Sequence, residues 1–380
     1  MSNYLTLILY ICIIIGSTVL AFASQKISWS SINNKYYCAR FSLILFFLSA
    51  LVAWLFLAFT NIGVDYPNYI YIVRQETWET FSSIYSVEPG FGVLCLLLKF
   101  VCGSNSDAVL FFIKSFSVIL YFICIFSLRK HISVGYAVFA YMALLYLPSF
   151  YLISMMFASS LIMVALTYVY LRKRYIFPMF LIIIAAQIHN SAYLFAAVFV
   201  LMWIVNKSKK LSKLKKQMIV VGYFIAIVGA GSIYNTASRV ISGFHYTRYA
   251  SGSVGGSGIM IIILYAPLAY ICYKLSRHNI SNEDRNNIFI FSITSFMFNV
   301  LSYHFSVIER MEFYMIPLYC LYIPSVLFSS GVIKHEHKKR YISIEMLVYI
   351  LYLLFRGYLV FSGRTTEAAG MANYSFFWPF

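Results

Sequence analysis

Thirteen apolar segments divide this sequence, and several approach the ~20 residues that an α-helix needs to cross the hydrocarbon of a bilayer. Outer-membrane barrels show short alternating segments instead. Hydrophobic residues make up 62% of the 380 residues and charged residues 11%, which is far too apolar for an ordinary water-soluble domain. The sequence therefore predicts an all-α, polytopic integral membrane protein with one membrane domain over residues 1–380. The segments lie at 3–23, 41–60, 89–103, 108–128, 132–148, 150–171, 175–187, 190–206, 217–234, 259–275, 286–304, 311–330 and 342–361.

Basic residues gather in six intervals between these segments, which hold 21 of the 29 lysines and arginines. Short loops rich in lysine and arginine stay in the cytoplasm, so these intervals are predicted to lie inside. The loops left outside are 61–88, 234–258 and 304–312, together with the tail after Ser362. These outer stretches contain seven of the 12 acidic residues. The net charge of +17 is therefore read as orientation and contact with membrane lipid, and not as a sign of nucleic-acid binding.

The predicted orientation places both chain ends outside, which requires an even number of crossings from thirteen segments. We expect about twelve transmembrane helices and one re-entrant or partial segment. Segment 89–103 is the best candidate, because it is short and begins with Pro89 and Gly90. Segments 175–187 and 190–206 form a second short pair. Irregular backbone at membrane depth is tolerated only where it is buried in protein or lines a wet cavity, so either location would mark a site.

The first long polar interval, residues 61–92, carries a third of the acidic residues of the chain: Asp65, Glu76, Glu79 and Glu88. We interpret it as an outward-facing loop that carries chemistry. Asp65 and Tyr69 would share one face if the loop opens with a helical turn. A carboxylate beside the low-dielectric membrane has a raised pKa and can serve as general base for a sugar hydroxyl. The alternative is that these acids keep an outer loop solvated.

Two further candidate side chains, His189 and Arg310, lie at the ends of apolar segments. His189 could exchange a proton near neutral pH or bond a phosphate oxygen, and a satisfied helix end is the alternative. Arg310 and Tyr314 would share a helical face at the mouth of a span, where a charge needs a partner or a ligand. Pairing of Arg310 with Glu309 or Glu312 is the alternative there.

The second large outer loop contains Arg248 and Tyr249 beside the glycine-rich run 251–258. The planar fork of arginine matches phosphate oxygens, and glycines let backbone N–H groups approach an anion. A flexible connector is an equal alternative for the glycines. No HExxH, GxSxG or DxD pattern stands in a convincing context, so nothing demands a metal and no cofactor is expected.

The order of these elements resembles the EpsG/Wzy group of polysaccharide polymerases. The resemblance covers most of the chain, although each motif is short. In this sequence the matching elements are Gly63-Val64-Asp65 with Tyr69, Glu88-Pro89-Gly90-Phe91, His189-Asn190-Ser191, Tyr246 with Tyr249, and Arg310 with Tyr314.

This resemblance implies a GT-C-like membrane fold and a glycosyltransferase that joins oligosaccharide repeats carried on undecaprenyl pyrophosphate. Such polymerases work in the bacterial cytoplasmic (inner) membrane, with the active site facing the periplasm or exterior. The product would be an O-antigen, a capsule or an exopolysaccharide. A flippase and a chain-length regulator are the expected partners.

The resemblance also implies roles for individual residues. Asp65 or Glu88, or failing those His189, would be the base. Arg248 and Arg310 would clamp the pyrophosphate. The candidate substrate-binding residues are Arg74, Arg248, Arg310, Tyr69, Tyr249 and Tyr314, the tyrosines stacking on sugars.

There is one departure from the group. Many relatives carry an Arg-Gln pair in the span represented here by residues 154–158, where this chain has no arginine. The pyrophosphate contacts would then come from Arg74, Arg239, Arg248 or Arg310.

Two other classes remain open at this stage. A lipid-linked oligosaccharide flippase would share the membrane and the substrate, but should place its charges along a central cavity between two repeats. A membrane O-acyltransferase could use His189 as its catalytic histidine. The length of the surface polysaccharide in a deletion strain distinguishes all three.

Overall fold

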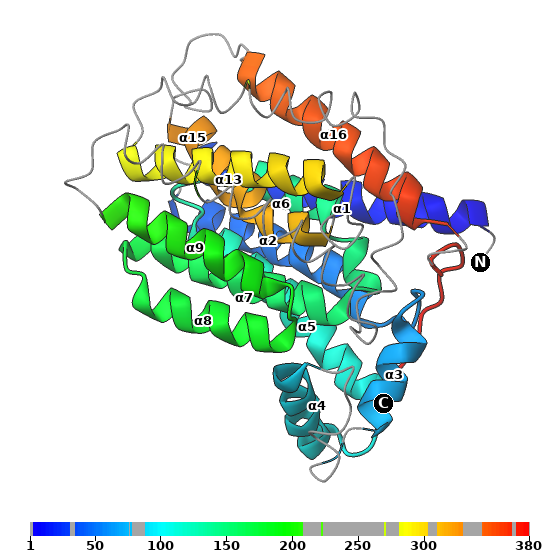
Figure 1. The fold of residues 1–380 in the computed structure, drawn as a ribbon. Helices are drawn as coiled ribbons and strands as arrows, with labels where there is room; N and C mark the ends of the chain where they lie inside the picture. Colours follow the sequence, from blue (N-terminus) through cyan, green and yellow to red (C-terminus); the bar gives the residue numbers. More distant parts are fainter. Residues whose placement is uncertain are drawn as a thin grey trace.

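The computed structural model describes residues 3–30, 35–75, 77, 88–207, 222, 270, 281–302, 310–329, 344–366 and 370–379. Every regular element in these ranges is a helix, which confirms the predicted all-α class. Most helices lie side by side, while α3 (Tyr66–Gln75) and α4 (Pro89–Cys102) lie together at one end of the bundle (Figure 1). We call this the α3 end. The opposite end is called the basic end, because Lys173 and Lys207 lie there beside Tyr170 and Tyr175.

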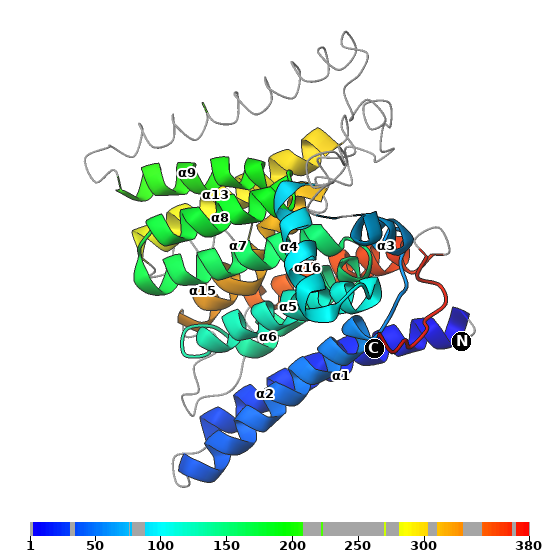
Figure 2. The ribbon, with the colours of Figure 1, turned by 90° about the horizontal axis from the view of Figure 1, so that it is seen from below.

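Helices α1 (Asn3–Ser30) and α2 (Lys35–Ala58) form a long antiparallel hairpin along one side of the bundle (Figure 2). Serines join the two helices. The Ser17 hydroxyl donates to the Ser49 carbonyl at 3.0 Å, and Ser24 and Ser42 make the equivalent contacts about two helical turns away. Lipid supplies no hydrophobic drive between helices, so small polar residues that allow close approach and hydrogen bonding hold such pairs.

The centre of the bundle consists of α5 (Ser106–Ser127), α6 (Val134–Leu144) and α7 (Ile153–Arg172). Helix α6 is short, but turns and the 3-10 helix η1 (Pro148–Phe150) extend its path toward the α3 end. Hydroxyl contacts lock α5 to α7: Tyr121 lies 2.6 Å from Ser159, and Ser117 donates to the Met156 carbonyl. The central helices are therefore fixed by paired polar groups as well as by apolar packing.

The other face of the bundle is built by the later helices. These are α8 (Ile176–Ile188), α9 (Ala192–Lys207), α13 (Asn282–Ser302), the irregular run η2 (Arg310–Met315), η3 (Leu318–Tyr322) and α15 (Ile323–Ser329), and α16 (Ile344–Arg364). At the basic end Asn206 of α9 donates to Asn287 of α13 at 2.7 Å, and Asn287 donates to Tyr322. This amide ladder ties three segments together far from the α3 end.

Among the described residues, five helices are long and apolar enough to cross a membrane, and all coincide with predicted segments. They are Tyr4–Lys26, Arg40–Ala58, Ser106–Ser127, Ile153–Arg172 and Ile344–Gly363. Five shorter apolar helices accompany them. The protein is thus an all-helical membrane protein. The total of about twelve crossings stays a prediction, because segments 217–234 and 259–275 lie almost wholly outside the described residues.

Helix α4 begins and ends at the α3 end of the bundle. Glu88, before it, contacts Asn190 just beyond α8, and Asn105, after it, donates to the Pro379 carbonyl at 2.6 Å. With 14 residues it is about 21 Å long, shorter than the ~30 Å hydrocarbon core. The helix is therefore short for a crossing, and the re-entrant or partial path of segment 89–103 stays a prediction.

The C-terminal residues 370–379 run back across the α3 end (Figure 2). They join the starts and ends of helices that are far apart in sequence. Phe376 and Trp378 both stack on Phe59. The hydrogen bonds are Gly63 N–H to Gly370 O, Tyr10 Oη to Met371 O, Phe377 N–H to Phe59 O, and Asn105 Nδ2 to Pro379 O. This tail therefore holds the turn that precedes α3.

The contact between α4 and α8 depends on Gly90. A Cβ at this position would lie 2.7 Å from the backbone carbonyl carbon of Gln187, so α4 would have to move away from α8. We expect Gly90→Ala to destabilise the protein by about 1–3 kcal/mol, measured by thermal unfolding in detergent. Gly363→Ala is the matched control, because nothing lies within 4 Å of its added Cβ. Equal stability of the two variants would contradict the close packing of α4.

Candidate functional site

The strongest chemical feature at the α3 end is a contact between Glu88 and His189. The Oε1 atom of Glu88 lies 3.0 Å from Nδ1 of His189, and only 16% and 22% of their side chains are exposed. Glu88 also accepts the backbone N–H of Asn190 at 3.4 Å. We call these two residues the acid–histidine pair. They are 101 positions apart in the printed sequence, so the fold alone brings them together.

Local backbone chemistry places each member of the pair at a helix end. Pro89 has no backbone N–H, suits the first helical position, and leaves Glu88 extended before α4. His189 is extended after α8, and its carbonyl accepts the N–H of Ala192 at 2.9 Å, which closes the tight turn into α9. Both side chains therefore project from short rigid junctions between helices.

The electrostatics favour an ionised Glu88. Burial raises the pKa of its carboxyl, but the hydrogen bond and the charge of His189 outweigh burial, so the pKa lies below its ordinary value. Because the pKa of Glu88 is lower in the folded than in the unfolded protein, its ionised carboxylate stabilises the folded state at a pH above the unfolded-state pKa. This stabilisation is lost as the pH falls through the pKa of Glu88 in the folded protein. At neutral pH the pair is held by a charge-assisted hydrogen bond.

The contacts of His189 determine which ring nitrogen remains reactive. Glu88 Oε1 and Ser154 Oγ both face Nδ1, at 3.0 and 3.3 Å. An ionised carboxylate only accepts hydrogen bonds, so Nδ1 must carry the hydrogen. In the neutral ring Nε2 is then the proton acceptor. The arrangement suits an imidazole that works as a general base with Glu88 as its orienting group.

Ser154, at the start of α7, links the pair to Tyr69 of α3. The Tyr69 hydroxyl lies 3.0 Å from Ser154 Oγ and accepts the Ser154 N–H at 3.3 Å. Burial raises the pKa of Tyr69 to about 12, although its hydrogen bonds with Ser154 oppose the rise. Tyr69 therefore stays a neutral donor at physiological pH. The Tyr69 N–H bonds to the Asp65 carbonyl at 3.0 Å, which confirms the predicted opening helical turn.

A second tyrosine closes the other side of the site. Tyr314 of η2 is buried, and its hydroxyl lies 2.8 Å from Ser191 Oγ, two residues after His189. Tyr314 also lies within electrostatic range of Glu88 and Tyr69. The site thus draws on six separate segments: α3, the start of α4, the start of α7, the end of α8, the start of α9, and η2.

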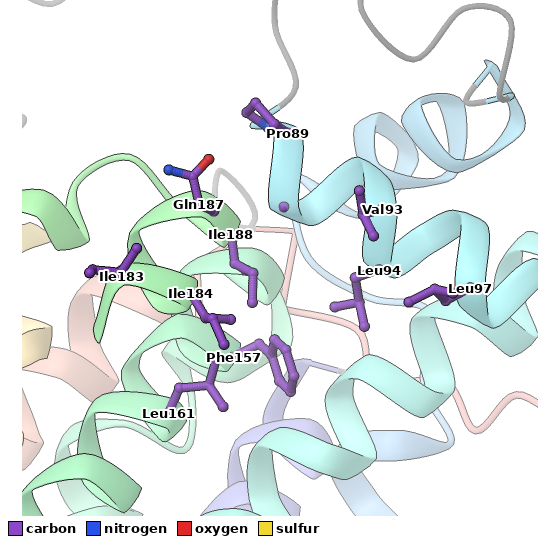
Figure 3. Close-up of a pocket in the computed structure, with 11 residues that line it drawn as sticks. Pro89, Val93, Leu94, Leu97, Phe157, Leu161, Ile183, Ile184, Gln187 and Ile188 are labelled. Atoms are coloured by element: carbon purple, nitrogen blue, oxygen red, sulfur yellow. The ribbon is translucent and has the colours of Figure 1, made fainter. Parts of the chain in front are cut away.

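An apolar groove of about 510 Å³ adjoins the acid–histidine pair. It lies between α4 on one side and α7 and α8 on the other (Figure 3). Its first residues on each wall, Pro89 and Ile188, directly follow Glu88 and precede His189 in sequence. The remaining lining residues are Gly90, Val93, Leu94, Leu97, Phe157, Leu161, Ile183, Ile184 and Gln187. Leu97 and Ile183 are half exposed, so the groove opens sideways.

The structure gathers four of the predicted site residues, Glu88, His189, Tyr69 and Tyr314, into this one cluster. Asp65 adjoins it through Tyr69, on which its charge acts. The other predicted residues lie elsewhere or cannot be placed. Arg74 is exposed in the last turn of α3. Arg239, Arg248, Tyr249 and the side chain of Arg310 lie outside the described residues.

Sequence reasoning missed the role of Ser154. A serine inside an apolar run has no distinctive spacing, and its partners lie 85 and 35 positions away. The only signal was its position, in the stretch where the resemblance led us to expect an arginine. Within the described ranges no three His, Cys, Asp or Glu side chains gather as metal ligands would.

With this geometry in hand, comparison with known proteins identifies the family. The EpsG family model matches residues 43–376. The chain belongs to the EpsG family. The match includes every segment of the candidate site, and it confirms the resemblance drawn from the sequence motifs. No curated protein and no solved structure gives a significant match to this EpsG-family chain, so its likeness to the GT-C fold stays a prediction.

The depressed pKa of Glu88 can be tested through stability. We expect Glu88→Gln to lower the free energy of unfolding at pH 7 by about 1–2 kcal/mol, because a hydrogen bond to a charged group is lost. The difference from the original protein should begin to shrink as the pH falls below the ordinary glutamate pKa of about 4.3, and it should disappear once the pH passes the lower pKa of Glu88 in the folded protein. Lys173→Gln, which removes the 42% exposed partner of the pair with Asp284, should change stability little. A pH-independent difference would contradict an ionised Glu88.

Proposed function

We propose that this EpsG-family protein is a polymerase that joins oligosaccharide repeats carried on undecaprenyl pyrophosphate at the outer face of the bacterial cytoplasmic membrane. The product is a surface polysaccharide. The observation that carries the proposal is the placement of the acid–histidine pair at one end of a sideways-opening apolar groove. Family membership supports a role in polysaccharide synthesis.

The acid–histidine pair supplies the base that glycosyl transfer needs. Nε2 of His189 removes the proton from an acceptor sugar hydroxyl, and the oxygen attacks C1 of the donor sugar. The bond from C1 to the pyrophosphate oxygen breaks, and undecaprenyl pyrophosphate leaves. Glu88 holds the ring and stabilises the imidazolium that forms. This assigns Glu88 and His189 to one proton-transfer unit, where the sequence offered them as separate alternatives to Asp65.

The groove suits the lipid part of such a substrate. A polyprenyl chain is apolar and lies in the bilayer, so it must enter the site from the side, between helices. Helices α4, α7 and α8 supply an apolar trough that starts beside the pair. The pyrophosphate would then lie at the end of the groove nearest Glu88 and His189.

The remaining substrate contacts are assigned as follows. Tyr69 flanks the pair and is partly exposed, so its hydroxyl group and ring can contact a sugar. Tyr314 is buried, and its hydroxyl supports Ser191 beside His189 instead. Arg248, Arg310 and Arg74 remain the candidates for the pyrophosphate, because their guanidinium groups belong to the predicted outer loops. A flippase and a chain-length regulator are the proposed partners of such a polymerase.

Deletion of the gene tests the function directly, with surface polysaccharide and lipid-linked sugars sized by gel electrophoresis. A polymerase deletion leaves single repeats on the lipid at the outer face. Absence of export would instead indicate a flippase, and a normal ladder that lacks acetyl groups an acyltransferase. We expect His189→Ala and Glu88→Gln to restore polymer formation about 10²–10⁴-fold less well than the intact gene. His131→Ala, exposed at the basic end, is the matched control and should restore it fully.

Filling the groove tests the lipid site separately from the chemistry. We expect Leu94→Trp to raise the KM for the undecaprenyl-linked substrate about tenfold while kcat changes less, because the ring occupies space meant for the lipid. The measurement is polymerisation by the purified protein in lipid nanodiscs. Ile119→Trp adds the same ring on a half-exposed face of α5 away from the groove. Equal KM values for the two variants would place the lipid elsewhere.

A further inference from the structure

Helix α16 lies along the outside of the bundle (Figure 1). Three polar side chains on one of its faces, which we call the polar stripe, contact the bundle. Tyr349, Tyr352 and Arg356 are three and four positions apart, and therefore share one face. Tyr349 donates to the Tyr319 carbonyl at 2.6 Å, and the Tyr352 and Tyr319 hydroxyls lie 2.8 Å apart. The opposite face is exposed, as at Leu351 and Leu354. The stripe fastens α16 to the segment 310–329.

The last member of the stripe is a charged pair inside the protein. Arg356 donates to the carboxylate of Glu312, and only 17% and 9% of the two side chains are exposed. Helix α16 is apolar enough to cross a membrane, so an arginine two thirds of the way along it is unusual. Two buried charges lose their hydration, so a buried ion pair often stabilises a fold no better than well-packed apolar residues would. Charges retained in such a helix are usually functional.

The partner of Arg356 lies on the element that completes the candidate site. Glu312, Phe313 and Tyr314 are consecutive in the 3-10 helix η2. They are tied in three directions: Glu312 to α16, the Phe313 carbonyl to Ser159 of α7 at 3.0 Å, and Tyr314 to Ser191 beside His189. A displacement of Glu312 therefore moves Tyr314.

The irregular backbone of η2 and η3 depends on these outside contacts to keep one conformation. Helix η2 is a 3-10 helix, and the π-helical turn η3 begins three positions after its last residue. Both forms are less stable than an α-helix, and they occur as short stretches that mark functional sites. A segment of this kind keeps one shape only when outside contacts fix it.

We propose that Arg356 and Glu312 are positioning residues that hold η2 so that Tyr314 stays against Ser191 and beside His189. The pair sets the geometry of the site without touching the substrate. The inference rests on the proposed polymerase function for its kinetic readout. It adds a residue in the last membrane helix that none of the sequence motifs includes.

The test is a double-mutant cycle on the purified protein in lipid nanodiscs. Arg356→Met should lower kcat about 10–100-fold and leave the KM for the lipid-linked substrate within about twofold, because the groove is untouched. In a Tyr314→Phe background the same change should cost less than about threefold, since the contact that it disturbs is already missing. The charge exchange Glu312→Arg with Arg356→Glu should recover most of the lost kcat.

Tyr352→Phe is the control for general loosening of α16, because it removes a neighbouring hydroxyl contact from the same face and should leave kcat unchanged. Independent losses from Arg356→Met and Tyr314→Phe, or normal kcat in the apolar double variant Glu312→Leu with Arg356→Met, would overturn the proposal. The two failures are distinguishable, because an inactive original protein contradicts the polymerase function alone. The coupling between Arg356 and Glu312 in thermal unfolding can still be measured in that case.

Discussion

The contact between Glu88 and His189 joins the start of the short helix α4 to the turn between α8 and α9 in the body of the protein. Pro89 and the tight turn after α8 hold the two side chains rigidly, and partial burial strengthens their charge-assisted hydrogen bond. The walls of the groove start from the same two junctions. The contact between Glu88 and His189 therefore fixes both the acid–histidine pair and the beginning of the apolar groove.

The rest of the α3 end supports this contact in layers. Ser154 and Tyr69 fix the ring on one side, and Tyr314 and Ser191 close the other. Behind them, the C-terminal tail holds the turn before α3, and Arg356 holds η2 through Glu312. The polar groups are paired with one another because lipid offers no water to satisfy them.

The positions of the predicted residues in the fold show which of them sequence reasoning can single out. Glu88 and His189 stood out because each is a polar residue at the edge of an apolar run, and such positions rarely occur without a reason in a membrane protein. Ser154 and Arg356 did not, although they make contacts of equal quality. Their importance depends on partners 35 and 44 positions away, and no periodicity in one sequence reveals such distances.

The sequence by itself determined that this protein is a bundle of apolar helices, because continuous hydrophobic runs can satisfy their backbone in lipid only as helices. It also determined the family, through short motifs kept in order along the chain. Only the tertiary structure decided that the acid, the histidine and two tyrosines meet, and that Glu88 and Ser154 both face Nδ1 of His189. Those facts depend on contacts between helix ends, which form after the helices pack and have no local signal.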